Sequence, residues 1–136
     1  MNGLTIGAVA KRARVHIETL RYYERQGLLA SPARSTSNYR LYAEDTVRRV
    51  RFIKAAQELG FSLKEILDLL SLRAEPNTSC EDIRERAEAK IKNLEEKIRS
   101  LRAMKQALTK LVTECSGSGP ITECPILESF DSGKPE

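Results

Sequence analysis

The chain has 136 residues, a formal net charge of +4 and no tryptophan. This length holds one small domain with an extended element but excludes two full-sized domains. The charge is uneven, because residues 1–60 carry 11 Lys and Arg against 5 Asp and Glu, whereas residues 61–136 carry 12 against 14. A basic amino-terminal half favours a polyanion-binding head followed by a scaffold with a different task.

No apolar run reaches the roughly 18–20 residues that cross a bilayer. Lys11, Arg12 and Arg14 also interrupt any apolar segment of a signal peptide. The chain is therefore expected in the cytoplasm, with no membrane partner. Cytoplasmic thiols stay reduced, so the three cysteines are poorly explained by disulfides.

Residues 4–29 read as two short helices with a break at 13–15. The second helix is expected from about Ile17 to Gln26, with Gly27 just beyond its end. Two short helices joined by a tight turn form a helix-turn-helix, whose second helix reads DNA. The apolar spacing turns one face inward, and its members are Ile6, Val9, Ala10, Ile17, Leu20 and Tyr23.

Residues 31–42 combine turn residues with Arg and Tyr. Pro32 and the cluster at 35–38 are typical of turns, and the alternation around them fits a small hairpin wing. An ordinary surface loop is the alternative interpretation. Arginine and tyrosine suit phosphate and groove contacts. Together with the second helix, the wing supplies the candidate DNA-contacting residues Glu18, Thr19, Arg21, Tyr22, Arg34, Tyr39 and Arg40.

A second helix pair is expected over residues 44–72. Its first helix covers roughly Glu44 to Leu59 and ends at Gly60. Ser62 and Glu65 have the spacing of a capping box, which opens a helix that continues through Leu72. The pair is expected to pack on the first as a second helix-turn-helix, with an inner face made of Val47, Val50 and Ile53.

A long helix is predicted from Cys80 to about Glu114, a stretch without Gly or Pro. Its apolar residues repeat with a period of 3.5, which is typical of a two-helix coiled coil. The rest of the chain offers nothing to cover so long an apolar seam, so we expect a homodimer. The heptad a positions are Ile91, Ile98, Lys105 and Val112, and the d positions are Ala87, Leu94, Leu101 and Leu108.

The three cysteines lie at the start of the long helix (Cys80), at its end (Cys115) and after a Gly/Ser/Pro loop (Cys124). A helix spanning the first two would hold them about 50 Å apart. One chain therefore cannot bring all three together. In an antiparallel dimer, Cys80 of one chain would lie beside the other two cysteines of the partner, which would create two equivalent three-thiolate sites.

Three thiolates with no histidine nearby favour a soft metal ion. The only histidine, His16, lies in the head and is expected as a surface or capping residue. Structural zinc would need a fourth ligand, for which Glu123 or a water is a candidate. Three unrelated small hydrophobic residues are the alternative interpretation of the cysteines.

Three segments resemble the MerR family of metal-responsive transcription regulators, and the resemblance extends over about residues 4–130. Residues 19–28 (TLRYYERQGL) are similar to its recognition helix, 38–42 (NYRLY) to its wing and 59–66 (LGFSLKEI) to its second helix-turn-helix. Two residues depart from the family pattern. Arg14 stands where the family usually has glycine, and His16 replaces a small polar cap.

The cysteines, with Pro125-Ile126-Leu127 after the last of them, are similar to those of the mercury-responsive members of the family. The resemblance implies that Hg(II) is held by Cys80, Cys115 and Cys124 drawn from both subunits. Lead-responsive members share this arrangement, so Pb(II), Cd(II) and Zn(II) are the alternative effector ions. A cysteine at position 80 goes with divalent ions, whereas sensors of monovalent ions usually have serine there.

The resemblance also implies how the regulator acts. A homodimer would occupy an inverted repeat in promoter DNA and hold the promoter inactive without metal. With metal, the heads would shift and the DNA would bend and untwist, which realigns the promoter for RNA polymerase. Deforming DNA in this way costs about 1–6 kcal/mol.

Other functional classes fit less well. A cysteine enzyme would need a base such as histidine, and His16 lies in a different region, so no catalytic residue is expected. An iron–sulfur sensor would use four clustered cysteines. A drug sensor would need a large carboxy-terminal ligand domain, and a plain coiled-coil adaptor leaves the cysteines and the basic head unexplained.

The expected fold class is mainly α, with a winged helix-turn-helix head, a second helix pair, a long antiparallel coiled-coil helix and a short metal-binding end. The expected divisions are a DNA-binding domain at 1–72, a linker at 73–79, a dimerisation helix at 80–114, a metal-binding loop and short helix at 115–130 and a disordered tail at 131–136.

Overall fold

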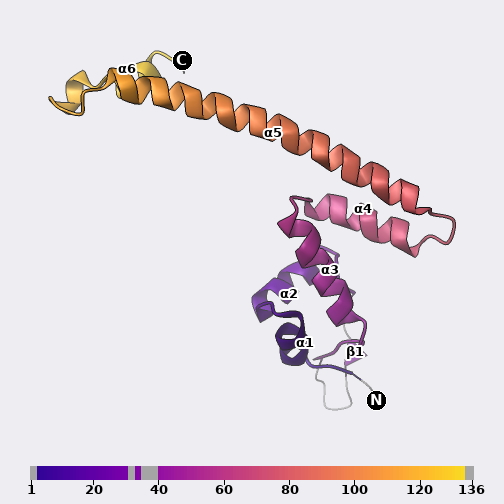
Figure 1. The fold of residues 1–136 in the computed structure, drawn as a ribbon. Helices are drawn as coiled ribbons and strands as arrows, with labels where there is room; N and C mark the ends of the chain where they lie inside the picture. Colours follow the sequence, from indigo (N-terminus) through magenta and orange to yellow (C-terminus); the bar gives the residue numbers. More distant parts are fainter. Residues whose placement is uncertain (1–2, 31–32, 35–39, 134–136) are drawn as a thin grey trace. The chain divides into compact units, whose positions relative to one another are not determined.

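The computed structural model describes residues 3–30, 33–34 and 40–133, and the described chain is mainly helical (Figure 1). It divides into two compact units, residues 1–87 and 88–136, with the boundary inside the longest helix. The expectation of a mainly α fold is confirmed. None of the described helices is long and apolar enough to cross a membrane.

The first unit contains two helix pairs, a two-stranded sheet and the start of the long helix. Its elements are α1 (Ile6–Ala13), α2 (Ile17–Arg25), β1 (Ala33–Arg34), β2 (Arg40–Leu41), α3 (Thr46–Glu58), α4 (Leu63–Ala74) and the first turns of α5 (Cys80–Glu114). The second unit contains the rest of α5, the short 3-10 helix η1 (Ile121–Glu123) and α6 (Pro125–Asp131).

The turn between α1 and α2 places an arginine in a left-handed conformation. Thr5 caps α1, because its Oγ1 accepts a hydrogen bond from the Ala8 amide at 3.1 Å. Arg14 ends α1 with φ 60°, and it is the only residue other than glycine with positive φ in the described part of the chain. Such a backbone favours glycine, since a Cβ costs about 1–2 kcal/mol there. The departure from the family pattern at this residue therefore falls on a strained position.

The core of the first unit lies between α1, α2, α3 and α4. The side chains that are fully buried there are Val9, Leu20, Leu28, Val50, Ile53 and Ile66. The inner faces predicted for these helices are mostly confirmed. The prediction is wrong for Ile17, which is 37% exposed because it begins α2 on the side away from α1.

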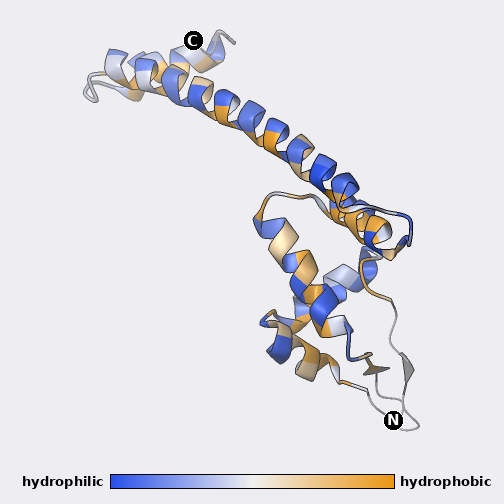
Figure 2. Ribbon diagram, turned by 45° about the vertical axis from the view of Figure 1, so that its right-hand side comes forward, coloured by the Kyte–Doolittle hydropathy of each residue, from blue (hydrophilic) through white to orange (hydrophobic). Residues whose placement is uncertain are grey.

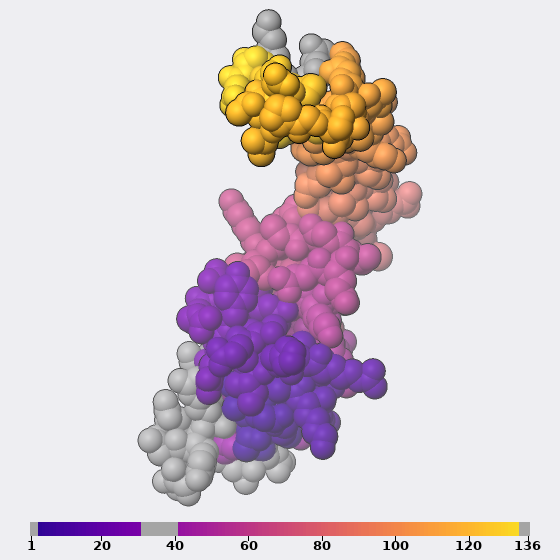
Figure 3. All heavy atoms as spheres, turned by 90° about the vertical axis from the view of Figure 1, so that its left-hand side faces the viewer, coloured from indigo at the N-terminus to yellow at the C-terminus, as the bar shows by residue number. Residues whose placement is uncertain are grey.

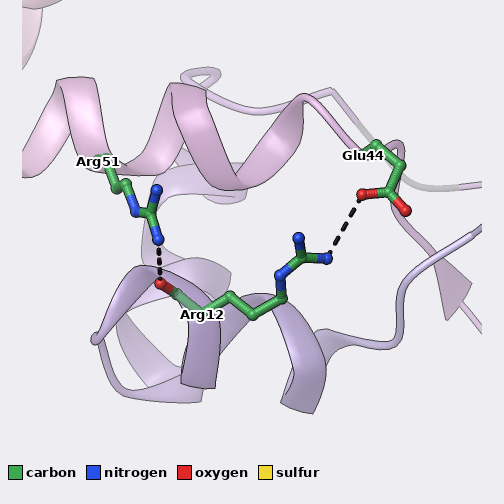
Figure 4. A network of polar contacts seen from close by, with 3 residues as sticks. All are labelled: Arg12, Glu44 and Arg51. Carbon is green, nitrogen blue, oxygen red and sulfur yellow. Dashed lines mark hydrogen bonds and ion pairs between the residues drawn. The ribbon is translucent and has the colours of Figure 1, made fainter.

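Helix α3 also binds the carboxy-terminal end of α1 through polar contacts (Figure 4). Arg51 Nη2 donates to the Arg12 carbonyl oxygen at 2.8 Å, and Lys54 Nζ donates to the Arg14 carbonyl oxygen at 3.1 Å. The Arg12 guanidinium in turn lies 3.4 Å from the Glu44 carboxylate. Cations at a helix carboxyl end satisfy free carbonyls and the negative end of the helix dipole. These contacts hold the first helix-turn-helix against α3.

The second helix pair has the predicted turn chemistry. Gly60 adopts φ 92° after α3, and the capping box of α4 is confirmed. The Glu65 amide donates to Ser62 Oγ at 3.1 Å, and the Ser62 amide donates to Glu65 Oε1 at 2.8 Å. Helix α3 begins at Thr46, later than predicted, and α4 continues to Ala74, two residues into the expected linker.

An antiparallel strand pair lies where the wing is expected. Ala33 pairs with Leu41, and Arg34 with Arg40. The sheet is extended by a bridge between Leu4 and Tyr42, whose amides and carbonyls exchange hydrogen bonds of 2.8 and 2.7 Å. The turn at 35–39 lies outside the described residues.

Helix α5 has the predicted bounds, with 35 residues from Cys80 to Glu114. Figure 2 shows an apolar stripe along one side of it and charged residues on the other. After it, the chain turns and α6 runs back beside the end of α5 (Figures 1 and 3). Pro125 opens α6 as predicted, whereas η1 was not predicted. Asp131 closes α6, although it was expected in a disordered tail.

Candidate functional site

The exposed side of α2 carries the candidate DNA-reading residues. Leu20 and Tyr23 on the opposite side are buried, so Glu18, Arg21 and Tyr22 face solvent. Half-buried Thr19 lies at the edge of this surface. The sequence prediction of a solvent-facing side is therefore confirmed for these α2 residues, while their contacts with DNA stay a prediction.

Two contacts order the charged groups on this surface. Arg21 Nη1 lies 3.0 Å from Glu18 Oε1, one helical turn away. The Arg25 guanidinium lies over the Tyr22 ring, 6.0 Å from its centroid. The guanidinium of Arg25 was not among the residues first singled out for DNA contact, and its place beside Tyr22 adds it to this surface. Arginine and tyrosine here offer donors and a planar ring to a DNA groove.

A hydrogen bond anchors α2 to the rest of the head. Tyr23 Oη donates to Gln57 Oε1 of α3 at 2.6 Å, and burial raises the pKa of the Tyr23 hydroxyl, with Glu58 and Tyr22 adding to the effect. Tyr42 Oη also donates to the Glu24 carboxylate. Sequence reasoning could not find these partners, because they are distant along the chain. They fix the orientation of the exposed side of α2.

Less of the wing can be placed. Arg34 and Arg40 face each other in the strand pair, and their side chains lie outside the described part. Tyr39 lies wholly outside the described residues. The DNA-contacting role of these three residues stays a prediction.

Cys80, the first residue of α5, is exposed and its thiol is free. The helix start is held by Asp82, whose Oδ2 accepts from the Ser79 amide at 3.0 Å. One turn further, Arg86 Nε donates to Asp68 Oδ2 of α4 at 2.5 Å, which ties the first turns of α5 to the second helix pair. Cys80 also lines an apolar groove of about 610 Å³, whose other walls include Phe52, Phe61, Leu69 and Ile83.

The other two cysteines bracket the loop after α5. Cys115 is half-buried, and its amide donates to the carbonyl oxygens of Leu111 and Val112 at 3.1 and 3.2 Å. Cys124 is half-buried at the amino-terminal end of α6, where its carbonyl accepts from the Glu128 amide at 3.0 Å. Both thiols are free.

The loop between Cys115 and Cys124 is shaped by glycine and serine. Gly117 and Gly119 adopt φ 79° and 96°, conformations that glycine takes without strain. Ser116 Oγ accepts from the Ser118 amide at 3.3 Å. The loop thus returns the chain towards the end of α5, with a cysteine at each end of the loop.

Within one chain, the described residues contain no group of three Cys, His, Asp or Glu side chains that could hold a metal ion. Cys80 and Cys115 instead lie at opposite ends of α5. His16, the only histidine, caps α2 in the head and is exposed, as expected for a surface or capping residue. The chain therefore offers a donor set of thiols, which suits soft ions.

Comparisons with known proteins agree on one family. The model of the MerR HTH family of regulatory proteins matches residues 4–72, and a model described as MerR, DNA binding, matches residues 47–111. The mercuric resistance operon regulatory protein of Pseudomonas fluorescens is 44% identical over 133 residues, which cover 98% of this chain and 91% of that protein. The transcriptional regulator ZntR of Escherichia coli is 35% identical over 130 residues, covering 94% and 92% of the two chains.

A solved structure gives the same answer for the fold. The crystal structure of a transcription regulator from Ralstonia metallidurans in complex with lead(II) superimposes with a TM-score of 0.81 and 36% sequence identity. The match covers 93% of this chain and 98% of that one. The similarity thus includes both the head and the long helix.

Proposed function

Since the chain belongs to the MerR family of helix-turn-helix regulators, we propose that it controls a heavy-metal resistance operon in response to Hg(II). The observation that carries this proposal is the similarity, over nearly the whole chain, to regulators of mercuric resistance operons. The regulator is metal-responsive, and the ion itself is the part proposed here.

We assign the sensing of the ion to Cys80 of one subunit and to Cys115 and Cys124 of the other. Three free thiols are the donor set that a soft ion prefers. The apolar groove beside Cys80 would limit the access of water to the bound ion. Such a site exists only when two chains meet, so an ion bound there stabilises one arrangement of the dimer over others.

DNA recognition is assigned to α2 and the wing. Arg21, ordered by Glu18, would contact a base edge in the major groove, and Tyr22 with Arg25 would contact the backbone beside it. Two heads of one dimer would occupy the halves of an inverted repeat. A change in their spacing on metal binding would deform the promoter and make it a substrate for RNA polymerase, so that a repressor becomes an activator.

The first experiment is a titration of the reduced protein with Hg(II) in excess competing thiol, followed by ultraviolet absorbance of the metal–thiolate bands. We expect tight binding that survives competition. Cys80→Ser, Cys115→Ser and Cys124→Ser should each abolish the metal response of transcription while DNA binding persists. A normal response in Cys80→Ser would exclude the site shared between subunits.

Arg21→Ala is the reciprocal control. Because its guanidinium lies on the head and far along the chain from the cysteines, metal binding should be unchanged. DNA affinity should fall by about 1–3 kcal/mol, as for loss of one base-reading arginine. Fluorescence anisotropy with operator DNA measures the loss.

Pb(II) is the second candidate effector. The structural similarity to a lead(II)-bound regulator favours it, and Cd(II) and Zn(II) complete the alternatives. If the competing thiol strips Hg(II) while Pb(II) stays bound, the same cysteines serve a lead sensor.

A further inference from the structure

The apolar stripe of α5 is uncovered within one chain. Ile91, Ile98, Leu101, Leu108 and Val112 are between 46% and 62% exposed, although they occupy successive heptad a and d positions. We call the eight a and d residues from Ala87 to Val112 the seam. A stripe of this kind is covered by another helix of the same pattern. A second copy of α5 provides one.

We propose that two copies of α5 pair antiparallel in a single register, with Ile98 level with the partner subunit's Leu101, and that Glu95 and Arg102 select this register. The proposal rests on the homodimer of the proposed function and specifies how its two chains meet. In antiparallel coiled coils an a residue of one helix lies level with a d residue of the other.

This register matches every seam residue with another. Ile91 lies level with Leu108 of the partner subunit, and Val112 with Ala87 of the partner subunit. Lys105 lies level with the partner's Leu94, so that its aliphatic stem covers an apolar neighbour while its ammonium reaches solvent. A slip by one heptad towards the amino termini puts Leu108 level with the partner's Arg84. The opposite slip puts Ile91 level with the partner's Cys115, beyond the helix.

Charges beside the seam favour the same register. Glu95 and Arg102 are exposed e positions on one flank, and Lys97 is a g position on the other. In antiparallel pairs, e residues meet e residues and g residues meet g residues. The proposed register joins Glu95 to Arg102 of the partner subunit, and the two-fold symmetry makes this pair twice.

Each slipped register instead brings like charges together. A slip towards the amino termini places Glu95 against the partner's Glu95, and Lys97 against the partner's Lys97. A slip in the other direction places Arg102 against the partner's Arg102. Like charges therefore exclude the slipped arrangements, while opposite charges stabilise one.

The register has a consequence for the cysteines, which were not used to derive it. It places Cys80 level with Gly119 of the partner subunit, inside the loop that the partner's Cys115 and the partner's Cys124 bracket. A slip by one heptad would move Cys80 by about 10 Å along the axis. Glu95 and Arg102 are thus positioning residues for the shared thiolate site.

Charge exchange tests the proposal. Glu95→Arg and Arg102→Glu, each alone, should raise the dimer dissociation constant about tenfold, because each creates two like-charge contacts. The double variant should return to within about twofold of the unaltered chain, since both pairs re-form with reversed polarity. Sedimentation equilibrium of the reduced, metal-free protein measures the constant. Glu96→Arg and Arg99→Glu, on the outer side of α5, make the same charge changes and should have no effect.

The thiolate absorbance of bound Hg(II) is the second measurement. Competing thiol should remove Hg(II) more readily from each single variant than from the double variant. A purely structural role for the two charges would lower stability without this restoration of the metal site. A double variant that dissociates as readily as the sum of the single ones would overturn the register.

A distance measurement covers the case in which the variants fold poorly. Spin labels on Lys110→Cys, in a chain with the three native cysteines replaced by serine, should lie about 32 Å apart along the axis, and a slip by one heptad would change this by about 10 Å. The slipped distance in a dimer that binds Hg(II) normally before cysteine replacement would refute the register and leave the proposed function intact. A monomeric unaltered chain would refute both.

Discussion

The two compact units of this chain treat their apolar residues in opposite ways. The first unit buries Leu20, Ile53 and Ile66 completely within one chain. In the second unit, Leu111 is buried by the returning segment, but the seam residues Leu101 and Leu108 are more than half exposed. The head is thus a self-sufficient domain, whereas the long helix is complete only with a second chain. A sensor site divided between subunits needs this second kind of surface.

The largest expected effect comes from truncating one apolar residue in each unit. Ile53→Ala should lower the free energy of unfolding by about 2–5 kcal/mol, because it opens a cavity in a closed core. The loss should be the same at every protein concentration.

Leu101→Ala is the matched change in the seam. Its effect should appear as a stronger dependence of the urea midpoint on protein concentration, since it weakens the contact between chains. Urea unfolding followed by circular dichroism at several concentrations separates the two cases. A concentration-independent loss for Leu101→Ala would contradict the contrast between the units.

A smaller effect is expected from Tyr23→Phe within the head. Loss of the hydrogen bond to Gln57 should cost about 1 kcal/mol. Tyr22→Phe, next to it on the exposed side, should have almost no effect on stability and is the control.

The same substitution has a pH signature. The folded-state pKa of Tyr23 is raised above 10.0 by burial, so its contribution to stability is complete below pH 10 and is lost as the pH rises through the folded-state pKa. The difference in stability between the unaltered chain and Tyr23→Phe should therefore shrink above pH 10. An increasing difference there would exclude burial of this hydroxyl.

The smallest effect is expected from Arg14→Gly, which should raise the stability of the head by about 0.5 kcal/mol. Glycine removes the strain of φ 60° but gains freedom in the unfolded chain, so the net gain is less than the strain itself. Thermal unfolding measures it, with Arg12→Gly inside α1 as a control that should destabilise. The dimer dissociation constant should not change.

Local patterns predicted the parts of this fold that depend on neighbours in sequence. The bounds of α5, the capping box at Ser62 and the proline that opens α6 follow from periodicity and terminal residues. The left-handed position of Arg14 was signalled by the departure from glycine in the family pattern. These features depend on a few adjacent residues, which the sequence displays directly.

Contacts between distant segments were beyond reach. The bond of Arg51 to the Arg12 carbonyl and that of Tyr23 to Gln57 depend on how helices pack, which spacing along the chain does not contain. Ile17 fits the inward spacing of α2 but starts the helix outside the core. Among the candidate site residues, the solvent-facing side of α2 was predictable, whereas the meeting of three cysteines needs the second chain.

The uncovered stripe of α5 also sets how quickly working regulator can accumulate. Assembly that needs two chains is second order, so the time a new chain waits for its partner grows in inverse proportion to the number of chains present. While it waits, it exposes leucine and isoleucine side chains to proteases and to other coiled-coil sequences. A scarce regulator of this design therefore depends on rapid and selective encounter, and selectivity in that encounter comes from the charges beside the stripe.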